Sequence, residues 1–175
     1  MSKAQIVKST FSIGPDIDFS SSTTEIDGFD FKIKTTEVNL SVGAGYYVID
    51  NLEISVGLAL ISSKTKIDND NQDSSNGVAF GPAITYKINV ASGFYIPVGA
   101  ALAFNSITNE DEFNDEYSFS GVSYGLFTGI EYIVNNKLGV HLNLGPSFGS
   151  LKDDDSDQEF DVTDFGIRTG FTFYF

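Results

Sequence analysis

The stretch Arg168-Thr169-Gly170-Phe171-Thr172-Phe173-Tyr174-Phe175 closes the chain and alternates in chemical type. A period of two is the mark of a β-strand whose two faces differ. Counting back from the end, one face carries Phe175, Phe173, Phe171, Thr169, Ile167 and Phe165. The other face carries Tyr174, Thr172, Gly170, Arg168 and Gly166. An apolar face opposite glycine, small polar residues and one arginine predicts an oily outside and a narrow polar inside, as in a transmembrane β-barrel.

The same alternation recurs in seven further segments, which have small or polar residues opposite the apolar ones. These segments are 7–19, 38–48, 52–60, 78–88, 94–104, 122–132 and 138–148. Eight strands of about ten residues match the length that a tilted strand needs to cross a bilayer. An eight-stranded barrel is too narrow to enclose the large apolar side chains, so they must face outward. This volume argument separates the chain from soluble lipocalin-type barrels, which are apolar inside.

The connections between these segments alternate in length. The short ones are built from turn-forming residues: Asp50-Asn51, Ala91-Ser92-Gly93 and Asn135-Asn136. The long ones are the acidic segments 20–32, 64–77, 105–118 and 151–164. We therefore expect an all-β fold, an eight-stranded antiparallel up-and-down transmembrane barrel with three short periplasmic turns and four long acidic extracellular loops. A change of alternation between Ile33 and Val38 is interpreted as a bulge or a loop-to-strand transition.

Aromatic residues gather near both ends of the predicted strands. Near the short turns lie Tyr46, Tyr86, Phe94, Tyr132 and Phe175. Near the long connections lie Phe19, Phe80, Phe104, Tyr124, Phe148 and Phe165. Two such belts are what anchoring at the two membrane interfaces requires.

Length and composition limit the remaining possibilities. The 175 residues predict a single barrel domain spanning 1–175. The absence of cysteine excludes disulfides, thiol catalysis and cysteine-ligated metals. Of the 24 acidic residues, 18 lie in the four long segments, and the net charge of -14 argues against nucleic-acid binding. No signal-peptide hydrophobic run follows Met1, so we expect that an export signal has been removed.

The chain resembles small eight-stranded bacterial outer-membrane proteins of the OmpA-transmembrane-domain and OmpX kind. The resemblance rests on a terminal pattern met by Arg168, Gly170, Phe173 and Phe175, and on the phrases at 45–52 and 80–86. It implies a monomer in the outer membrane of a Gram-negative bacterium, with lipid and lipopolysaccharide as surroundings and no cofactor. It also implies that the terminal strand is the signal read by the barrel-assembly machinery.

Charged residues on the inward faces predict an ion-pair network in the lumen. Isolated charges there would cost several kcal/mol each, so they are expected to pair. The predicted members, all placed toward the periplasmic half, are Lys8, Glu53, Lys87, Glu131 and Arg168. We expect Arg168 to bridge Glu131 or Glu53. The network is interpreted as a structural plug, and the alternative is a gate or a proton-linked switch.

Two other features were weighed for chemistry. His141 is the single histidine, and His141-Leu142-Asn143 lacks the serine of the His-x-Ser run found in barrel-type lipid A deacylases, so we expect no catalysis. Two acidic runs hold oxygen ligands at alternate positions, as calcium loops do: Asp68, Asp70 and Asp73, and Asp153, Asp155 and Asp157. Neither run has the glycine and glutamate of an EF-hand, so weak divalent binding is the most they predict.

The sequence favours a structural or surface-interaction role for a plugged barrel. The alternative is a minor pore or carrier for small solutes or hydrophobic molecules. An enzyme would need a triad or metal site that the sequence lacks, and an adhesin role rests on analogy alone.

Overall fold

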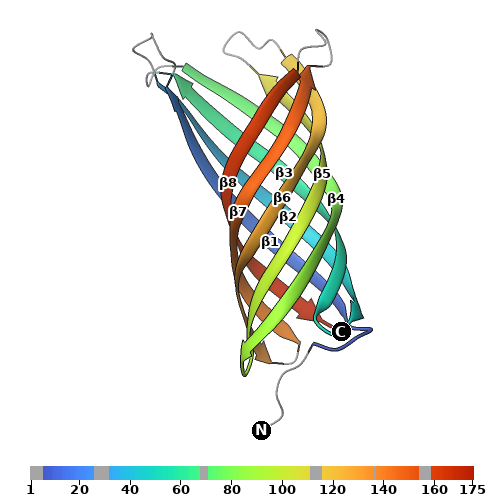
Figure 1. Ribbon diagram of the computed structural model, residues 1–175. Helices are drawn as coiled ribbons and strands as arrows, with labels where there is room; N and C mark the ends of the chain where they lie inside the picture. The colour runs from blue at the N-terminus through green and yellow to red at the C-terminus, as the bar shows by residue number, and fades with distance from the viewer. Residues whose placement is uncertain (1–5, 26–31, 68–70, 111–115, 136, 154–158) are drawn as a thin grey trace.

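The computed structural model describes residues 6–25, 32–67, 71–110, 116–135, 137–153 and 159–175. Eight strands fill these ranges: β1 (Phe11–Glu25), β2 (Lys32–Ile49), β3 (Leu52–Ile67), β4 (Asn71–Ala91), β5 (Phe94–Glu110), β6 (Glu116–Asn135), β7 (Leu138–Asp153) and β8 (Glu159–Tyr174). Each strand pairs antiparallel with the next, and β1 pairs with β8, so the sheet closes (Figure 1). The predicted eight-stranded up-and-down barrel is confirmed. No helix in the described part of the chain has the length and apolarity to cross a membrane.

The three short turns, the start of β1 and the C-terminus lie at one end of the barrel (Figure 1). In the turns, Asn51 has φ 63° and Gly93 has φ 81°, a left-handed conformation that asparagine and glycine tolerate best. Register shifts occur just before each turn, as between Tyr47 and Ile49 of β2. The β1·β2 ladder, in contrast, runs without a shift from Phe11↔Tyr46 to Glu25↔Lys32, so the change of alternation after Ile33 is not a bulge.

The outer wall is a continuous apolar band on all eight strands. Exposed side chains such as Val56, Leu58 and Leu126 alternate with lumen-facing ones along each strand. Aromatic rings pair across strands at both edges of this band. The ring centroids of Phe94 and Tyr132 lie 4.5 Å apart at the short-turn edge of the band. Those of Phe80 and Phe104 lie 5.3 Å apart at the opposite edge. An apolar band with an aromatic girdle at each edge fits a bilayer.

The band ends sharply at the edge away from the short turns. Its last outward apolar residues on β2 to β8 are Val38, Leu60, Val78, Phe104, Val122, Phe148 and Phe165. The next outward residues are all small and polar: Thr36, Ser62, Asn76, Ser106, Ser120, Ser150 and Thr163. This ring of hydroxyl and amide side chains marks where the barrel leaves the apolar layer.

The expectation of four long loops is wrong in extent. Most of the segments 20–32, 64–77, 105–118 and 151–164 belongs to strands, which run well past the apolar band. The physical reason is that a strand outside the membrane needs no apolar outer face, although its backbone still pairs with its neighbours. The loss of alternation therefore marked the membrane boundary and not the end of the strands. The remaining connecting residues lie outside the described ranges.

All four prolines lie inside strands, at Pro15, Pro82, Pro97 and Pro146. Each keeps its place opposite one neighbouring strand, as Pro82 does opposite Val56. In the ladder with the strand on its other side, each proline has no paired residue. A proline has no N–H to donate, so one side of the ladder is lost there.

Candidate functional site in the barrel lumen

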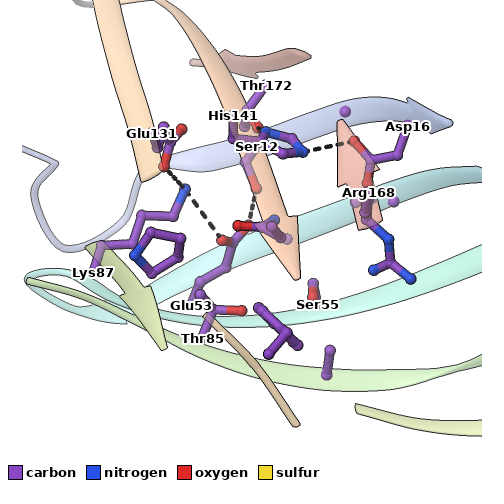
Figure 2. Close-up of a pocket in the computed structure, with 18 residues that line it drawn as sticks. Ser12, Asp16, Glu53, Ser55, Thr85, Lys87, Glu131, His141, Arg168 and Thr172 are labelled. Carbon is purple, nitrogen blue, oxygen red and sulfur yellow. Dashed lines mark hydrogen bonds and ion pairs between the residues drawn. The ribbon is translucent and has the colours of Figure 1, made fainter. Parts of the chain in front are cut away.

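The short-turn end of the lumen is closed around one buried cation. Lys87 of β4 is 5% exposed, and its Nζ lies 2.6 Å from Glu131 Oε2 of β6. The same Nζ lies 3.8 Å from Glu53 Oε2 of β3. Figure 2 shows the three side chains converging from different strands. Because two carboxylates face one ammonium at close range, no charge in this group is left alone in a low-dielectric space.

Three tyrosines complete this closure. Tyr47, Tyr95 and Tyr174 are almost fully buried and cluster with Ile6 and Ile133. The Tyr47 hydroxyl donates to Glu53 Oε2 at 3.0 Å, and Lys87 Nζ donates to the Tyr174 hydroxyl at 2.7 Å.

Further hydroxyl groups satisfy the two carboxylates. The Tyr174 hydroxyl donates to Glu131, and the Ser12 hydroxyl donates to Glu53. The Lys87 ammonium also lies 5.7 Å and 5.2 Å from the ring centroids of Tyr47 and Tyr174, within reach of a cation–π attraction. We call Tyr47, Glu53, Lys87, Glu131 and Tyr174 the plug.

Two predicted members of the network lie elsewhere. Lys8 precedes β1 and is exposed, and its backbone N–H donates to Asp50 Oδ1 at 2.8 Å. Arg168 does not bridge Glu131 or Glu53. Its Nε donates to Asp18 Oδ1 at 2.6 Å, because the β1·β8 register sets these two residues opposite one another. Both expectations are therefore corrected, and Arg168 belongs to a second tier above the plug.

The second tier holds two acid–base contacts. His141 Nε2 lies 2.9 Å from Asp16 Oδ1, and His141 Nδ1 lies 3.3 Å from Thr172 Oγ1 (Figure 2). Asp16 Oδ1 nevertheless accepts no hydrogen bond of good geometry, so the histidine contact is one of proximity. The Asp18–Arg168 pair is the other contact, and 44% of the Arg168 side chain is exposed to water although it points into the lumen. Water therefore reaches this tier.

The lumen holds two stacked cavities. The lower, of about 130 Å³, lies between the plug and the Asp16–His141 contact. The upper, of about 380 Å³, extends from Arg168 toward Glu37 and Asp164 near the rim. Phe127 lines both, and it is an inward aromatic residue in the middle of the barrel. Gly99 makes room for it, because a Cβ at residue 99 would collide with the Phe127 ring.

Sequence reasoning missed several lumen residues, among them Tyr47, Phe127, Ile133 and Ile6. Strand parity would have found the first three, since each is an even number of residues from an inward residue on its own strand. Their apolar character made them look like outer-wall residues instead. Ile6 precedes β1, so alternation carried no signal for it.

The terminal residues of the predicted assembly signal take two orientations. Phe173 and Phe175 are exposed on the outer wall, whereas Gly170 is buried against Asp16 and Pro15. Phe175 exchanges two backbone hydrogen bonds with Phe11, at 3.2 Å and 2.9 Å, which extends the closing β1·β8 seam to the last residue.

The acidic runs considered for divalent cations are only partly described. Asp68, Asp70, Asp155 and Asp157 lie outside the described residues. Asp73 and Asp153 lie in β4 and β7 near their ends remote from the short turns. Within the described ranges, no three histidine or acidic side chains gather as a metal site would require.

Comparison with known proteins agrees with this geometry. The family model of the outer membrane protein beta-barrel domain matches residues 1–173. Neisserial surface protein A has a similar structure, with a TM-score of 0.66 at 17% identity over 94% of this chain and 97% of that one. OprG, an outer membrane protein of Pseudomonas aeruginosa, has a TM-score of 0.69 at 12% identity over 99% of both chains. Ail, the attachment invasion locus protein of Yersinia pestis, has a TM-score of 0.55 at 14% identity, over 96% of this chain and 99% of that one. The sequence has no significant match among curated proteins.

Proposed function

The chain belongs to the outer membrane protein beta-barrel family, and we propose that it is a plugged barrel with a structural or surface-interaction role. The family and the structural neighbours indicate the bacterial outer membrane as its location. The observation that carries the proposal is the plug. It places one cation, two carboxylates and two tyrosines across the short-turn end of the lumen.

The plug opposes conduction for an energetic reason. A solute crossing the short-turn end must separate Lys87 from Glu131 or displace the buried rings of Tyr47 and Tyr174. Separating this pair would leave each charge without its partner in a low-dielectric space, which favours the closed arrangement. The rim end carries the remaining connections to the outside, where a surface role would be exercised.

Two of the structural neighbours support the surface role by name. One is a neisserial surface protein and another is an attachment invasion protein. For this chain we propose a monomer surrounded by lipid and lipopolysaccharide, without cofactor or catalytic function. Thr172 and Asp16 flank His141, but Thr172 is buried and its contact with Nδ1 is long at 3.3 Å, so we assign His141 a hydrogen-bonding role in the lumen.

Conductance in planar bilayers tests the plugged state. The wild type should show no sustained single-channel steps, because the plug blocks the lumen. A Tyr47→Ala and Tyr174→Ala double variant should show them, since two buried rings are removed. Tyr46→Ala is the matched control, because Tyr46 is the neighbouring residue on the outer wall. Equal steps in the wild type and the double variant would overturn the plugged reading.

A second candidate is a minor pore or carrier for small solutes or hydrophobic molecules. It is favoured by the open upper lumen, where Arg168 is 44% exposed beside a cavity of about 380 Å³. Steps in the wild type that disappear when the upper lumen is narrowed by Ala103→Phe would support this candidate.

We further propose that Arg168, Gly170, Phe173 and Phe175 form the signal read by the assembly machinery. The outward orientation of Phe173 and Phe175 supports it, because both rings are exposed on the outside of the barrel. Phe175→Ala should slow insertion by purified assembly machinery into proteoliposomes. Phe171→Ala, which removes another exposed ring on the outer wall of β8, should leave the insertion rate nearly unchanged.

A further inference from the structure

The seam that closes the barrel is paired over only part of its length. The β1·β8 ladder ends at Phe19↔Ile167, and the described part of the chain shows no pairing between these strands beyond it. Both strands nevertheless continue, because β1 stays paired with β2 as far as Glu25 and β8 stays paired with β7 as far as Glu159. Figure 1 shows the two strands diverging toward the end of the barrel remote from the short turns. Each strand therefore has a free edge at this level.

The side chains along β8 have the surroundings that an open seam requires. Val162 lies an even number of residues from the lumen-facing Tyr174, and yet it is 41% exposed. A Cβ at Gly166 would meet nothing within 4 Å. The upper cavity is lined by Ser20 of β1 and by Gly166 of β8, so it reaches the seam from the inside. The lumen and the outside therefore meet along the free edge of β8.

The free edge of β8 directs backbone N–H and C=O groups into the seam. Phe175 exchanges two backbone hydrogen bonds with Phe11 of β1, and alternate residues of a strand direct these groups to the same side. Because β8 keeps one register with β7 along its length, the groups of Asp161, Thr163 and Phe165 point across the seam. Among the described residues these groups have no hydrogen-bond partner. An unpaired edge of this kind is a template for a further strand.

The charge of this edge indicates what kind of strand fits it. The segment Glu159–Gly166 contains three acidic residues and no basic one. Asp161 is exposed, and Asp164 lines the upper cavity on the lumen side. The free segment of β1, Ser20–Glu25, contains one acidic residue and no basic one. A second copy of this chain would thus bring like charges together at the seam, which is destabilising, whereas a basic strand has the complementary charge.

We propose that the free edge of β8 binds an extended basic segment of another protein. This segment pairs antiparallel with Glu159–Gly166 and takes the place that β1 leaves. Its backbone exchanges hydrogen bonds with Asp161, Thr163 and Phe165, and its basic side chains face Asp161 on the outside of the barrel. The inference rests on the proposed surface-interaction role, for which it names a class of partner, and it does not depend on whether the plug blocks conduction.

Binding of synthetic peptides tests the inference in refolded full-length protein in lipid nanodiscs, with empty nanodiscs as the blank. A labelled peptide of alternating lysine and threonine, as long as the free edge, should bind in a fluorescence-anisotropy titration. The same peptide methylated at every backbone nitrogen keeps its charge but cannot donate backbone hydrogen bonds, so it should bind roughly tenfold more weakly. A peptide with glutamate in place of lysine should not bind. Equal binding of the first two peptides would overturn the inference, since charge alone would then explain it.

Two variants at one position of β8 test the pairing from the side of the barrel. Thr163→Pro removes a seam-facing N–H without breaking a bond to β7, and it should weaken binding of the lysine–threonine peptide about tenfold. Thr163→Val keeps this N–H and is the matched control, with binding unchanged. Heat-modifiable gel mobility checks that both variants fold. Equal affinities of the two variants would contradict the pairing. Dimers of the barrel in place of peptide binding would assign the edge to a second copy and would also overturn the inference.

A pair of cysteines tests whether the seam is open. If the β1·β8 ladder continued in register, residue 22 would face Asp164. Because a disulfide needs Cα atoms within about 7 Å, Ser22→Cys with Asp164→Cys should stay reduced under a mild oxidant. Asp18→Cys with Arg168→Cys, from the paired part of the seam, should cross-link under the same conditions. Equally fast cross-linking of both pairs would show that the seam closes on itself and would overturn the inference. Channel steps in the wild type would instead overturn the plugged role and leave this inference standing.

Discussion

The two halves of this barrel use charged residues in opposite ways. In the short-turn half, Lys87 is enclosed with Glu53 and Glu131, and hydroxyl groups satisfy the remaining oxygens. In the rim half, Arg168 holds only Asp18 and remains 44% exposed, while Glu37 and Asp164 face a cavity. The same fold thus contains a packed floor, in which one cation is shared by two hydrogen-bonded carboxylates, and an open, acidic chamber. The difference teaches that burial and the number of close partners decide how strongly a lumen charge can stabilise the barrel.

The largest effect should follow loss of the plug cation. Lys87→Met leaves two buried carboxylates facing each other and should lower the free energy of unfolding by about 3–5 kcal/mol. Urea unfolding of the refolded barrel in liposomes measures it. The triple variant with Glu53→Gln and Glu131→Gln removes all three charges and should recover much of the loss. A loss below about 1 kcal/mol in Lys87→Met would show that the plug does not depend on its cation.

The next effect tests where the apolar layer ends. Leu58 and Ser62 both point outward from β3, but Leu58 lies within the apolar band and Ser62 lies just beyond it. Leu58→Lys should therefore cost about 2–4 kcal/mol, and Ser62→Lys should cost about 0–1 kcal/mol. The same urea titration measures both. Similar costs at the two positions would show that the apolar layer does not end between Leu58 and Ser62.

A smaller effect should distinguish the packed floor from the open chamber through two glycines. A Cβ at Gly139 would collide with the Glu131 carboxylate, whereas a Cβ at Gly166 would meet nothing within 4 Å. Gly139→Ala should cost about 1–3 kcal/mol because it displaces a plug residue in a tightly packed region. Gly166→Ala should be neutral or slightly stabilising, because alanine reduces the freedom of the unfolded chain. Equal costs would mean that the chamber is as tightly packed as the floor.

The barrel fold could be predicted from the sequence because the alternation of apolar and polar residues is a local property of each strand. Each apolar face could be phased from its own segment, and closure followed from the even number of strands and the short turns. The rim strands were missed for the same reason, since Ser62, Ser106 and Ser120 end the outward alternation without ending the backbone pairing. Local pattern therefore reports the membrane boundary more directly than the strand boundary.

The lumen contacts were only partly accessible from sequence. Glu53 lies directly after a short turn and Lys87 and Glu131 lie shortly before one, so their height in the barrel could be read from the chain. Arg168 lies farther from any turn, and its partner depends on the register of the seam that closes the barrel. That register links the first strand to the last, and no local pattern encodes it. The pairing of Arg168 with Asp18, and the cavity above these two residues, could be identified only from the structure of the closed barrel.

The smallest effect should come from repeating the first substitution in the other half. Arg168→Met removes a cation whose side chain is 44% exposed, from Asp18, whose side chain is 16% exposed. Exposed pairs contribute about 0–1 kcal/mol, so the free energy of unfolding should change by no more than that in the titration that reports on Lys87→Met. A loss as large as that of Lys87→Met would show that the rim half depends on its cation as strongly as the floor does. A small loss would confine the stabilising role of charge to the plug, where the cation is buried and has two carboxylates close by.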